Sequence, residues 1–259
     1  NQLVQEGAAK GERYGELFDE QMKPKLVNDT AISALDHYRE VTQFMPSDLA
    51  NAMPWDVGRQ IFFEGRVAQA NWWTDMPKGA ADPSISKVAD KIKCAPSWGD
   101  VTVLPYGRAM GIAKNSANKE GAFQAIAWIQ KAANANRWVA ETFSQSLMDP
   151  WRMSMFNEPA STFPLQAESG FADNFASVSK QMLANDKAYL DISIPGTNQY
   201  LASMIQHVQR AVTGQATSEE ALKAMEVEFE DTTELFNRER QISHYDEYRQ
   251  RMIANGYWS

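Results

Sequence analysis

The residues that could support catalysis or bind a metal lie far apart along this sequence. His37, His207 and His244 are separated by long stretches, and none belongs to an HExxH arrangement. The chain also lacks a CxxC pair, a GxSxG turn, a phosphate-binding loop and a GxGxxG fingerprint. Glu226 and Glu230 share a face if their segment is helical, and such a pair could give oxygen ligands to a metal. We interpret them as the solvated surface of a helix.

An enzyme is therefore not expected, and neither is a cofactor or a metal. An enzyme with dispersed carboxylates stays an alternative, because acid–base pairs are often distant in sequence. The single cysteine, Cys94, cannot form a disulfide within the chain. We expect it to be a small buried residue beside a strand. A cytosolic protein and an exported protein without disulfides both fit this cysteine usage.

Chain length and net charge further limit the classes of protein to which this chain can belong. The chain has 259 residues, which is enough for one large domain or two lobes with a sizeable core. Its apolar share is 44%, and no stretch approaches the roughly 18 consecutive apolar residues of a membrane span. The net charge is −8, from 25 basic and 33 acidic residues, without a basic block. The lack of a long apolar stretch predicts a soluble protein. The lack of a basic block argues against nucleic-acid binding.

The clearest structural signal is a pair of helices between residues 199 and 224. Gly214 can take the left-handed conformation that ends the first helix. Thr217 and Glu220 have the spacing of a capping box, which begins the second. The first helix has an apolar stripe at helical spacing, made of Leu201, Met204, Ile205, Val208, Ala211 and Val212.

The rest of the chain reads as helix-rich with a few strands. Asn28, Asp29 or Thr30 can cap one helix, and Asn118 can cap another, with Phe123 among its inward residues. Prolines between residues 149 and 166 indicate a loop. Further helices are expected near 57–63, 171–183 and 242–253. Strands are expected near 66–73, 88–96 and 101–113. This suits an α/β domain with part of its sheet absent.

Five segments follow one another in a recognisable order over about residues 28 to 235. They are Phe62-Phe63-Glu64-Gly65-Arg66-Val67-Ala68 with Trp72-Trp73 after it, Val103 to Asn118 followed by Lys119-Glu120-Gly121-Ala122, Ser146 to Ser154 with its Pro-x-Arg-x-Ser loop, Pro195 to Tyr200, and the helix pair. Together they resemble the extracellular solute-binding proteins of ABC importers, in the sugar-binding group that includes the maltodextrin-binding proteins. Gln69 departs from the family's usual methionine, and the tail after about residue 236 has no counterpart.

The resemblance implies a periplasmic-binding-protein-like α/β fold of two lobes joined by hinge strands. Because it begins midway through the family's chain, we expect a truncated form. Residues 1–104 would be a second-lobe segment. Residues 105–158 would be a hinge crossing with a helical part of the first lobe. Residues 159–259 would be the second-lobe return and the C-terminal helices.

The implied function is capture of a carbohydrate or polyol in the cleft between lobes, for delivery to the membrane subunits of an ABC importer. The protein would be periplasmic or extracellular and associated with the cell surface. Aromatic planes stack on the apolar faces of sugars, and planar polar groups bind the hydroxyls. A helical protein–protein interaction module is the alternative of another class. The implied ligand-binding residues are Trp72, Trp73, Tyr106, Gly107, Arg108, Asp149, Trp151, Arg152, Gln199 and Tyr200.

Each of these residues also has an ordinary structural explanation. Trp72 and Trp73 would point to opposite sides of a strand, so one faces the cleft and the other packs; we favour Trp73 for the cleft. Arg108 can form a surface salt bridge, and Arg152 can pair with Asp149. Tyr200 can belong to the core.

The expected truncation has a consequence for the segment 101–113. A strand whose neighbours are absent exposes unpaired backbone groups. We therefore expect self-association and poor sugar binding from this chain.

Overall fold

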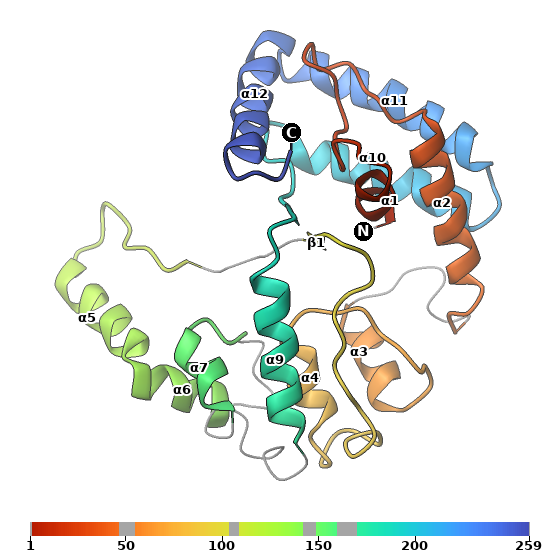
Figure 1. The fold of residues 1–259 in the computed structure, drawn as a ribbon. Helices are drawn as coiled ribbons and strands as arrows, with labels where there is room; N and C mark the ends of the chain where they lie inside the picture. The colour runs from red at the N-terminus through yellow and green to blue at the C-terminus, as the bar shows by residue number, and fades with distance from the viewer. Residues whose placement is uncertain (1, 47–54, 104–108, 142–148, 160–169, 259) are drawn as a thin grey trace. The chain divides into compact units, whose positions relative to one another are not determined.

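The computed structural model describes residues 2–46, 55–103, 109–141, 149–159 and 170–258 (Figure 1). The described part is mostly helical. Its elements are α1 (Gln2–Ala9), α2 (Asp29–Thr42), α3 (Trp55–Phe63), α4 (Met76–Ala80), β1 (Thr102–Val103), α5 (Lys119–Gln130), α6 (Ala132–Glu141), α7 (Met153–Asn157), α9 (Phe171–Leu183), β2 (Ala188–Tyr189), α10 (Thr197–Val212), α11 (Ser218–Leu235) and α12 (Arg238–Ala254).

The chain divides into two compact units. Unit 1 contains Asn1–Ala52, Trp98–Pro105 and Asn185–Ser259, and unit 2 contains Met53–Ser97 and Tyr106–Ala184. These boundaries differ from those of the three predicted segments. The assignment of those segments to lobes of the family fold stays a prediction.

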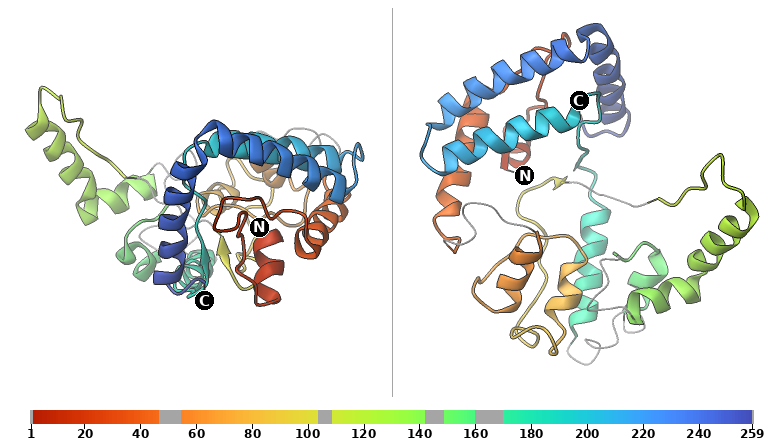
Figure 2. Two further views of the ribbon diagram at one scale, coloured as in Figure 1. Left: turned by 90° about the horizontal axis from the view of Figure 1, so that it is seen from above. Right: turned by 180° about the vertical axis from the view of Figure 1, so that it is seen from behind.

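Unit 1 is built around the long helices α10 and α11, which run side by side (Figures 1 and 2). An aromatic group fills the centre of its core. The ring of Phe18 lies 5.3 Å from that of Tyr200, 5.5 Å from that of Phe229 and 5.6 Å from that of Tyr245. The Tyr245 hydroxyl donates to the backbone oxygen of Phe18 at 3.0 Å. The segment before α2 is thereby attached to the C-terminal helices.

The predicted helix pair is confirmed. Gly214 has a φ of +75° just after α10. The side chain of Thr217 accepts from the N–H of Glu220, whose carboxylate accepts from the N–H of Thr217. The predicted apolar stripe of α10 is wrong in part, because Ile205 is 66% exposed and Leu201 is also exposed. The buried face is instead formed by Tyr200, Ser203, His207 and Ala211, with Met204 and Val208 partly buried beside it.

Most of the predicted strands are absent from the described residues. Residues 66–73 form no strand, and their polar and small side chains at 69–71 are exposed. Residues 88–96 form none either, because the backbone N–H and C=O of Cys94 are bonded by the side-chain amide of Asn174. Cys94 is partly buried against an apolar cluster and does not lie beside a strand. The expectation of an α/β sheet is thus corrected, for the described part, to a helical structure with one short ladder.

That ladder is formed by β1 and β2, which pair in parallel with Thr102 opposite Ala188. Of the predicted strand 101–113, residues 104–108 lie outside the described residues, and 109–113 are not a strand. The expectation that this strand has no neighbour within the chain is wrong for Thr102 and Val103. Val101 has a partner too, since its backbone exchanges two hydrogen bonds with the Gln5 side chain.

Unit 2 contains α3 to α7 and α9. Its cores are small, and one is formed by Phe63, Met76 and Ala80 with Phe62, Trp72 and Ile92 packed against it. The second is formed by Ala81, Ala135, Val139, Met155, Phe171, Ala172 and Phe175, with Ile92, Cys94 and Trp151 packed against it. Asn118 caps α5 as predicted, but the helix has no buried residue, and the expected inward Phe123 is 58% exposed.

Candidate functional site

The candidate site lies in unit 2, where two predicted segments meet. The Thr74 hydroxyl donates a hydrogen bond to Oδ1 of Asp149 at 2.5 Å. Thr74 directly follows the predicted pair Trp72 and Trp73. Asp149 opens the predicted proline-containing loop, so this bond joins the two segments.

The two tryptophans differ in their surroundings. Trp72 is partly buried against Phe63, Met76 and Ala80, while Trp73 is 52% exposed. Their rings lie 5.9 Å apart at an interplanar angle of 73°. Trp73 therefore offers an accessible ring supported from one side by Trp72. Trp72 is thus the packed member of the pair, although no strand separates the two side chains, and a cleft position for Trp73 stays a prediction.

Charged groups follow directly at the start of α4. Asp75 precedes the helix, and Lys78 within it is only 1% exposed. Burial, and then the nearby charge of Asp149, raise the pKa of Asp75. Burial lowers the pKa of Lys78 to about 8, opposed by the carboxylates of Asp149 and Asp75. Two carboxylates and one enclosed ammonium group thus lie within electrostatic reach of one another.

Close packing fixes this part of α4. A Cβ atom on Gly79 would lie 2.8 Å from Cζ of Phe63 in α3, so only glycine fits without movement. Pro77 stands in the first turn of α4, where a missing N–H is tolerated. The short helix is therefore held against α3, and Asp75 and Lys78 are positioned with it.

Trp151 and Arg152 both use Gln130 as a partner. The indole Nε1 of Trp151 donates to Oε1 of Gln130 at 3.1 Å. Nη1 of Arg152 donates to the backbone oxygen of Gln130 at 2.7 Å. The suggested pairing of Arg152 with Asp149 is not among the hydrogen bonds seen for these described residues, and Asp149 bonds to Thr74 instead.

Several buried polar atoms of unit 2 have no hydrogen-bond partner among the described residues. They include donors as well as acceptors. A buried polar atom left without a partner costs about 1–3 kcal/mol. Four of these atoms belong to the two segments that the Thr74–Asp149 bond joins, and the fifth belongs to α6. The atoms are Nε1 of Trp72, Oδ1 of Asp75, Oδ1 of Asn136, Nε of Arg152 and Oγ of Ser154.

The remaining predicted site residues lie elsewhere. Tyr106, Gly107 and Arg108 are outside the described residues. Gln199 is exposed in the first turn of α10, in unit 1. Tyr200 is 2% exposed, and its hydroxyl bonds to Oγ1 of Thr233 at 2.8 Å. It therefore lies in the core of unit 1, which was the alternative to a ligand-binding role.

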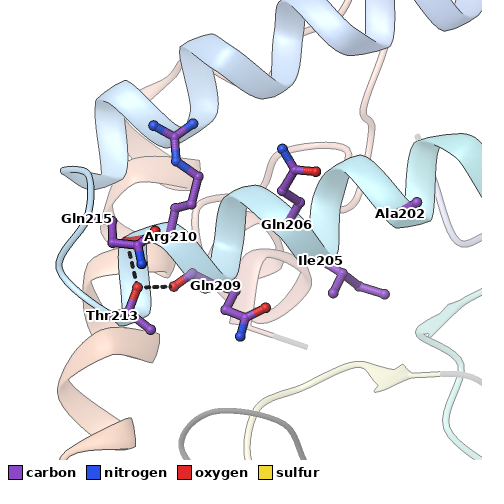
Figure 3. A pocket seen from close by; sticks show the side chains of 7 residues that line it. All are labelled: Ala202, Ile205, Gln206, Gln209, Arg210, Thr213 and Gln215. Carbon is purple, nitrogen blue, oxygen red and sulfur yellow. Dashed lines mark hydrogen bonds between the residues drawn. The ribbon is translucent and has the colours of Figure 1, made fainter.

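Unit 1 has a surface pocket of about 700 Å³ along α10 and the turn that follows it (Figure 3). Five of its seven lining residues belong to this helix, and three of the seven are glutamines. The hydroxyl of Thr213 donates to the backbone oxygen of Gln209 at 2.9 Å. The lining residues are Ala202, Ile205, Gln206, Gln209, Arg210, Thr213 and Gln215.

Sequence reasoning missed Thr74, Asp75, Lys78 and Gln130. The sequence does contain a pattern that indicates a helix start there, since Asp75 and Pro77 directly follow the tryptophans. No sequence pattern indicates that Lys78 is buried, because lysine is almost always exposed. Among the described residues, no group of histidine, cysteine, aspartate and glutamate side chains is arranged to hold a metal ion.

The family comparison gives one match. A family model described as bacterial extracellular solute-binding protein matches residues 7–136. Comparison with curated proteins gave no match. In the part of the chain that the structure describes, no helix combines the length and apolar character needed to cross a membrane.

Proposed function

This chain belongs to the family of bacterial extracellular solute-binding proteins, and we propose that the solute it captures is a carbohydrate or a polyol. Proteins of this family bind a small molecule in the periplasm or outside the cell and deliver it to the membrane subunits of an ABC importer. The family is generally non-enzymatic. The choice of ligand class rests on the residues around Thr74 and Asp149.

The observation that carries the proposal is the mixture of unpartnered donors and acceptors near an exposed tryptophan. Nε1 of Trp72 is a donor and Oδ1 of Asp75 is an acceptor, and both are buried without a partner in the described structure. A hydroxyl group both donates and accepts, so neighbouring hydroxyls can satisfy both kinds of atom. Small side-chain rotations on binding would bring these atoms to the ligand.

The ring of Trp73 supplies the second requirement of sugar binding. Its exposed face can stack on the C–H face of a pyranose, and Trp72 supports it from behind. Asp149 accepts from Thr74 through one oxygen and retains further lone pairs for ligand hydroxyls. In this proposal Trp73 stacks and Asp149 accepts, while Trp72, Trp151 and Arg152 line the site.

Ligand contacts by Tyr106, Gly107 and Arg108, which lie outside the described residues, and by Gln199 of unit 1 stay predictions. Tyr200 is left out of the proposal, since its ring and hydroxyl are already engaged in the core of unit 1. Pocket residues along α10 are not part of it either.

Isothermal titration calorimetry with a ligand panel tests the proposed class. Glucose, maltose, trehalose and sorbitol form the polyhydroxyl set, and leucine and spermidine form the control set. The proposal expects a saturable heat from at least one polyhydroxyl compound and none from the controls. Binding of leucine or spermidine alone would contradict the carbohydrate class and leave the family assignment intact.

The interaction module is the second candidate, and one observation favours it. Phe123 and Trp128 are exposed on α5, a helix without buried residues in the described structure. Exposed aromatic side chains of this kind are enriched at protein interfaces. If a protein partner covers α5, Phe123→Ser together with Trp128→Ser should abolish its binding and leave the calorimetric response to sugars unchanged.

A further inference from the structure

Resting on the proposed function, we infer that Gln130 is a positioning residue for the sugar site. From the end of α5 it holds Trp151 and Arg152 through two hydrogen bonds. Through the short loop before them it keeps the carboxylate of Asp149 in one orientation, ready to accept from a ligand hydroxyl. Gln130 acts through these residues and does not touch the ligand.

Two different atoms of Gln130 hold the loop. The indole Nε1 of Trp151 donates to the side-chain oxygen Oε1 at 3.1 Å, and Nη1 of Arg152 donates to the backbone oxygen at 2.7 Å. The first bond depends on the glutamine side chain, whereas the second requires only the backbone. The bonds span 21 and 22 positions of sequence, so the fold of unit 2 and not local chain geometry brings α5 to the loop.

The end of α5 gives a physical reason for the contact with Arg152. The helix ends at Gln130, and Lys131 after it has an extended backbone. The last carbonyl groups of a helix have no partner within the helix and carry the negative end of its dipole. A guanidinium group that donates to such a carbonyl satisfies the acceptor and is favoured by the dipole. The side chain of Asn134 satisfies the carbonyl of Trp128 in the same helix end, at 2.7 Å.

The loop between Asp149 and Trp151 is restrained at both ends. Asp149 accepts from the Thr74 hydroxyl at one end. At the other end Trp151 packs against the second core cluster of unit 2 and donates to Gln130. Pro150 between them is buried, and the proline ring fixes its own φ and restricts the residue before it. A change at Gln130 is therefore passed along a stiff segment to Asp149.

The restrained loop retains hydrogen-bonding capacity for a ligand. An ionised carboxylate offers about four lone-pair sites, of which the Thr74 hydroxyl uses one on Asp149. Arg152 uses Nη1 on Gln130, and its Nε is buried without a partner among the described residues. An acceptor and a donor thus lie three positions apart on one loop. Because a hydroxyl group both donates and accepts, a polyhydroxyl ligand suits this pair when the loop is held in place.

The test compares Gln130→Met with Gln130→Glu. Methionine keeps the length of the side chain and removes the acceptor for the Trp151 indole, while glutamate keeps an oxygen at that position. Gln124→Met is the matched control, because Gln124 is also exposed on α5 and its amide donates to Glu120 of the same helix at 3.0 Å. Gln130→Ala removes the same acceptor and is the substitute if Gln130→Met does not fold.

Proton–nitrogen NMR without sugar is the first readout. The indole proton of Trp151, identified by its loss in Trp151→Phe, should move upfield in Gln130→Met because its acceptor is gone. The backbone amide signals of Thr74 and Asp149 should shift as well, since the loop loses one of its fixed ends. Gln130→Glu and Gln124→Met should leave these signals near their wild-type positions. Unshifted amide signals of Thr74 and Asp149 in Gln130→Met would overturn the inference.

Sugar affinity is the second readout, with maltose, glucose and sorbitol titrated into each variant by calorimetry. Gln130→Met should weaken binding about fivefold, which corresponds to one hydrogen bond, and Gln130→Glu should retain most of the wild-type affinity. In a Trp151→Phe background, Gln130→Met should weaken binding no further, because the indole donor is already absent. Equal losses in both backgrounds would show that Gln130 acts by another route and would overturn the inference.

The two readouts separate this inference from the proposed function. If wild type binds none of the three sugars, the proposed ligand class fails, while the sugar-free spectra still decide whether Gln130 positions Asp149. If wild type binds a sugar and folded Gln130→Met binds it equally well, the ligand class stands and the inference fails.

Discussion

The hydroxyl of Thr74 donates to the carboxylate of Asp149 across 75 positions of sequence. This hydrogen bond joins the segment that contains Trp72, Trp73 and the buried Lys78 to the loop that contains Trp151 and Arg152. A candidate ligand site in unit 2 depends on this contact, because neither segment has a regular strand to hold it in the described structure.

Thr74→Val tests that contact. Valine keeps the shape of threonine and removes the hydroxyl, so Asp149 loses its donor at nearly constant packing. We expect a loss of about 1 kcal/mol in the free energy of unfolding, measured by urea denaturation. Thr74→Ser keeps the hydroxyl and should lose clearly less. Equal losses in both variants would show that the methyl group, and not the hydrogen bond, matters.

Gln5→Leu tests the partner of the short ladder. The Gln5 amide donates to the backbone oxygen of Val101 at 2.7 Å and accepts from its N–H at 3.0 Å. Leucine would leave both buried backbone groups without a partner, so we expect a loss of about 2 kcal/mol or more in urea denaturation. Gln206→Leu, on the exposed side of α10, is the matched control and should be near neutral. A near-neutral Gln5→Leu would contradict the assigned role.

Gly99→Ala tests the packing of the Gln5 side chain against the backbone at Gly99. A Cβ atom would lie 2.2 Å from Oε1 of Gln5, and the φ of Gly99 is +86°, which alanine rarely adopts. Alanine should therefore lower the midpoint of thermal unfolding, monitored by circular dichroism. Gly214→Ala also has a positive φ but meets no atom within 4 Å, so its smaller effect would isolate the contribution of the clash.

Stability should depend on pH through Lys78. Its pKa is lowered from 10.5 to about 8 in the folded protein, so between these values the unfolded chain binds the proton and the folded chain does not. Stability therefore rises with pH in this window and is lost as pH falls through about 8. Above pH 10 the raised pKa values of Tyr245 and Tyr248 act in the opposite direction. Urea denaturation at about pH 7.5 and about pH 9.5 should show a gain in wild type that is absent in Lys78→Met; equal gains would contradict the prediction.

The helices could be predicted because their signals are local. Asn28 caps α2 by accepting from the N–H of Ala31, and the Thr217 capping box begins α11, each within four residues of chain. The strands could not be predicted in the same way, since a strand needs a partner. Cys94 meets the side chain of Asn174, 80 positions away, where the sequence pattern suggested a sheet neighbour.

The site could be predicted only in part for the same reason. Exposure of Trp73 fits the favoured interpretation, but the pairing of Thr74 with Asp149 is long-range and leaves no local pattern. Tyr200 illustrates the ambiguity, because an aromatic residue in the first turn of a helix fits both a binding site and a core. Two further expectations stay predictions. One is that this chain corresponds to the later part of the family's sequence, and the other is that the protein self-associates.

The proposal that the ligand is a sugar stacked on the face of Trp73 is the central claim. The most direct measurement is tryptophan fluorescence during titration with the panel sugar that gives the largest calorimetric heat, in wild type, Trp73→Ala and Trp98→Ala. Trp98 is 48% exposed in unit 1 and serves as the matched control. The account predicts that Trp73→Ala weakens binding by on the order of 1 kcal/mol, about fivefold, and that Trp98→Ala binds as wild type does. Unchanged affinity in a folded Trp73→Ala protein would contradict it.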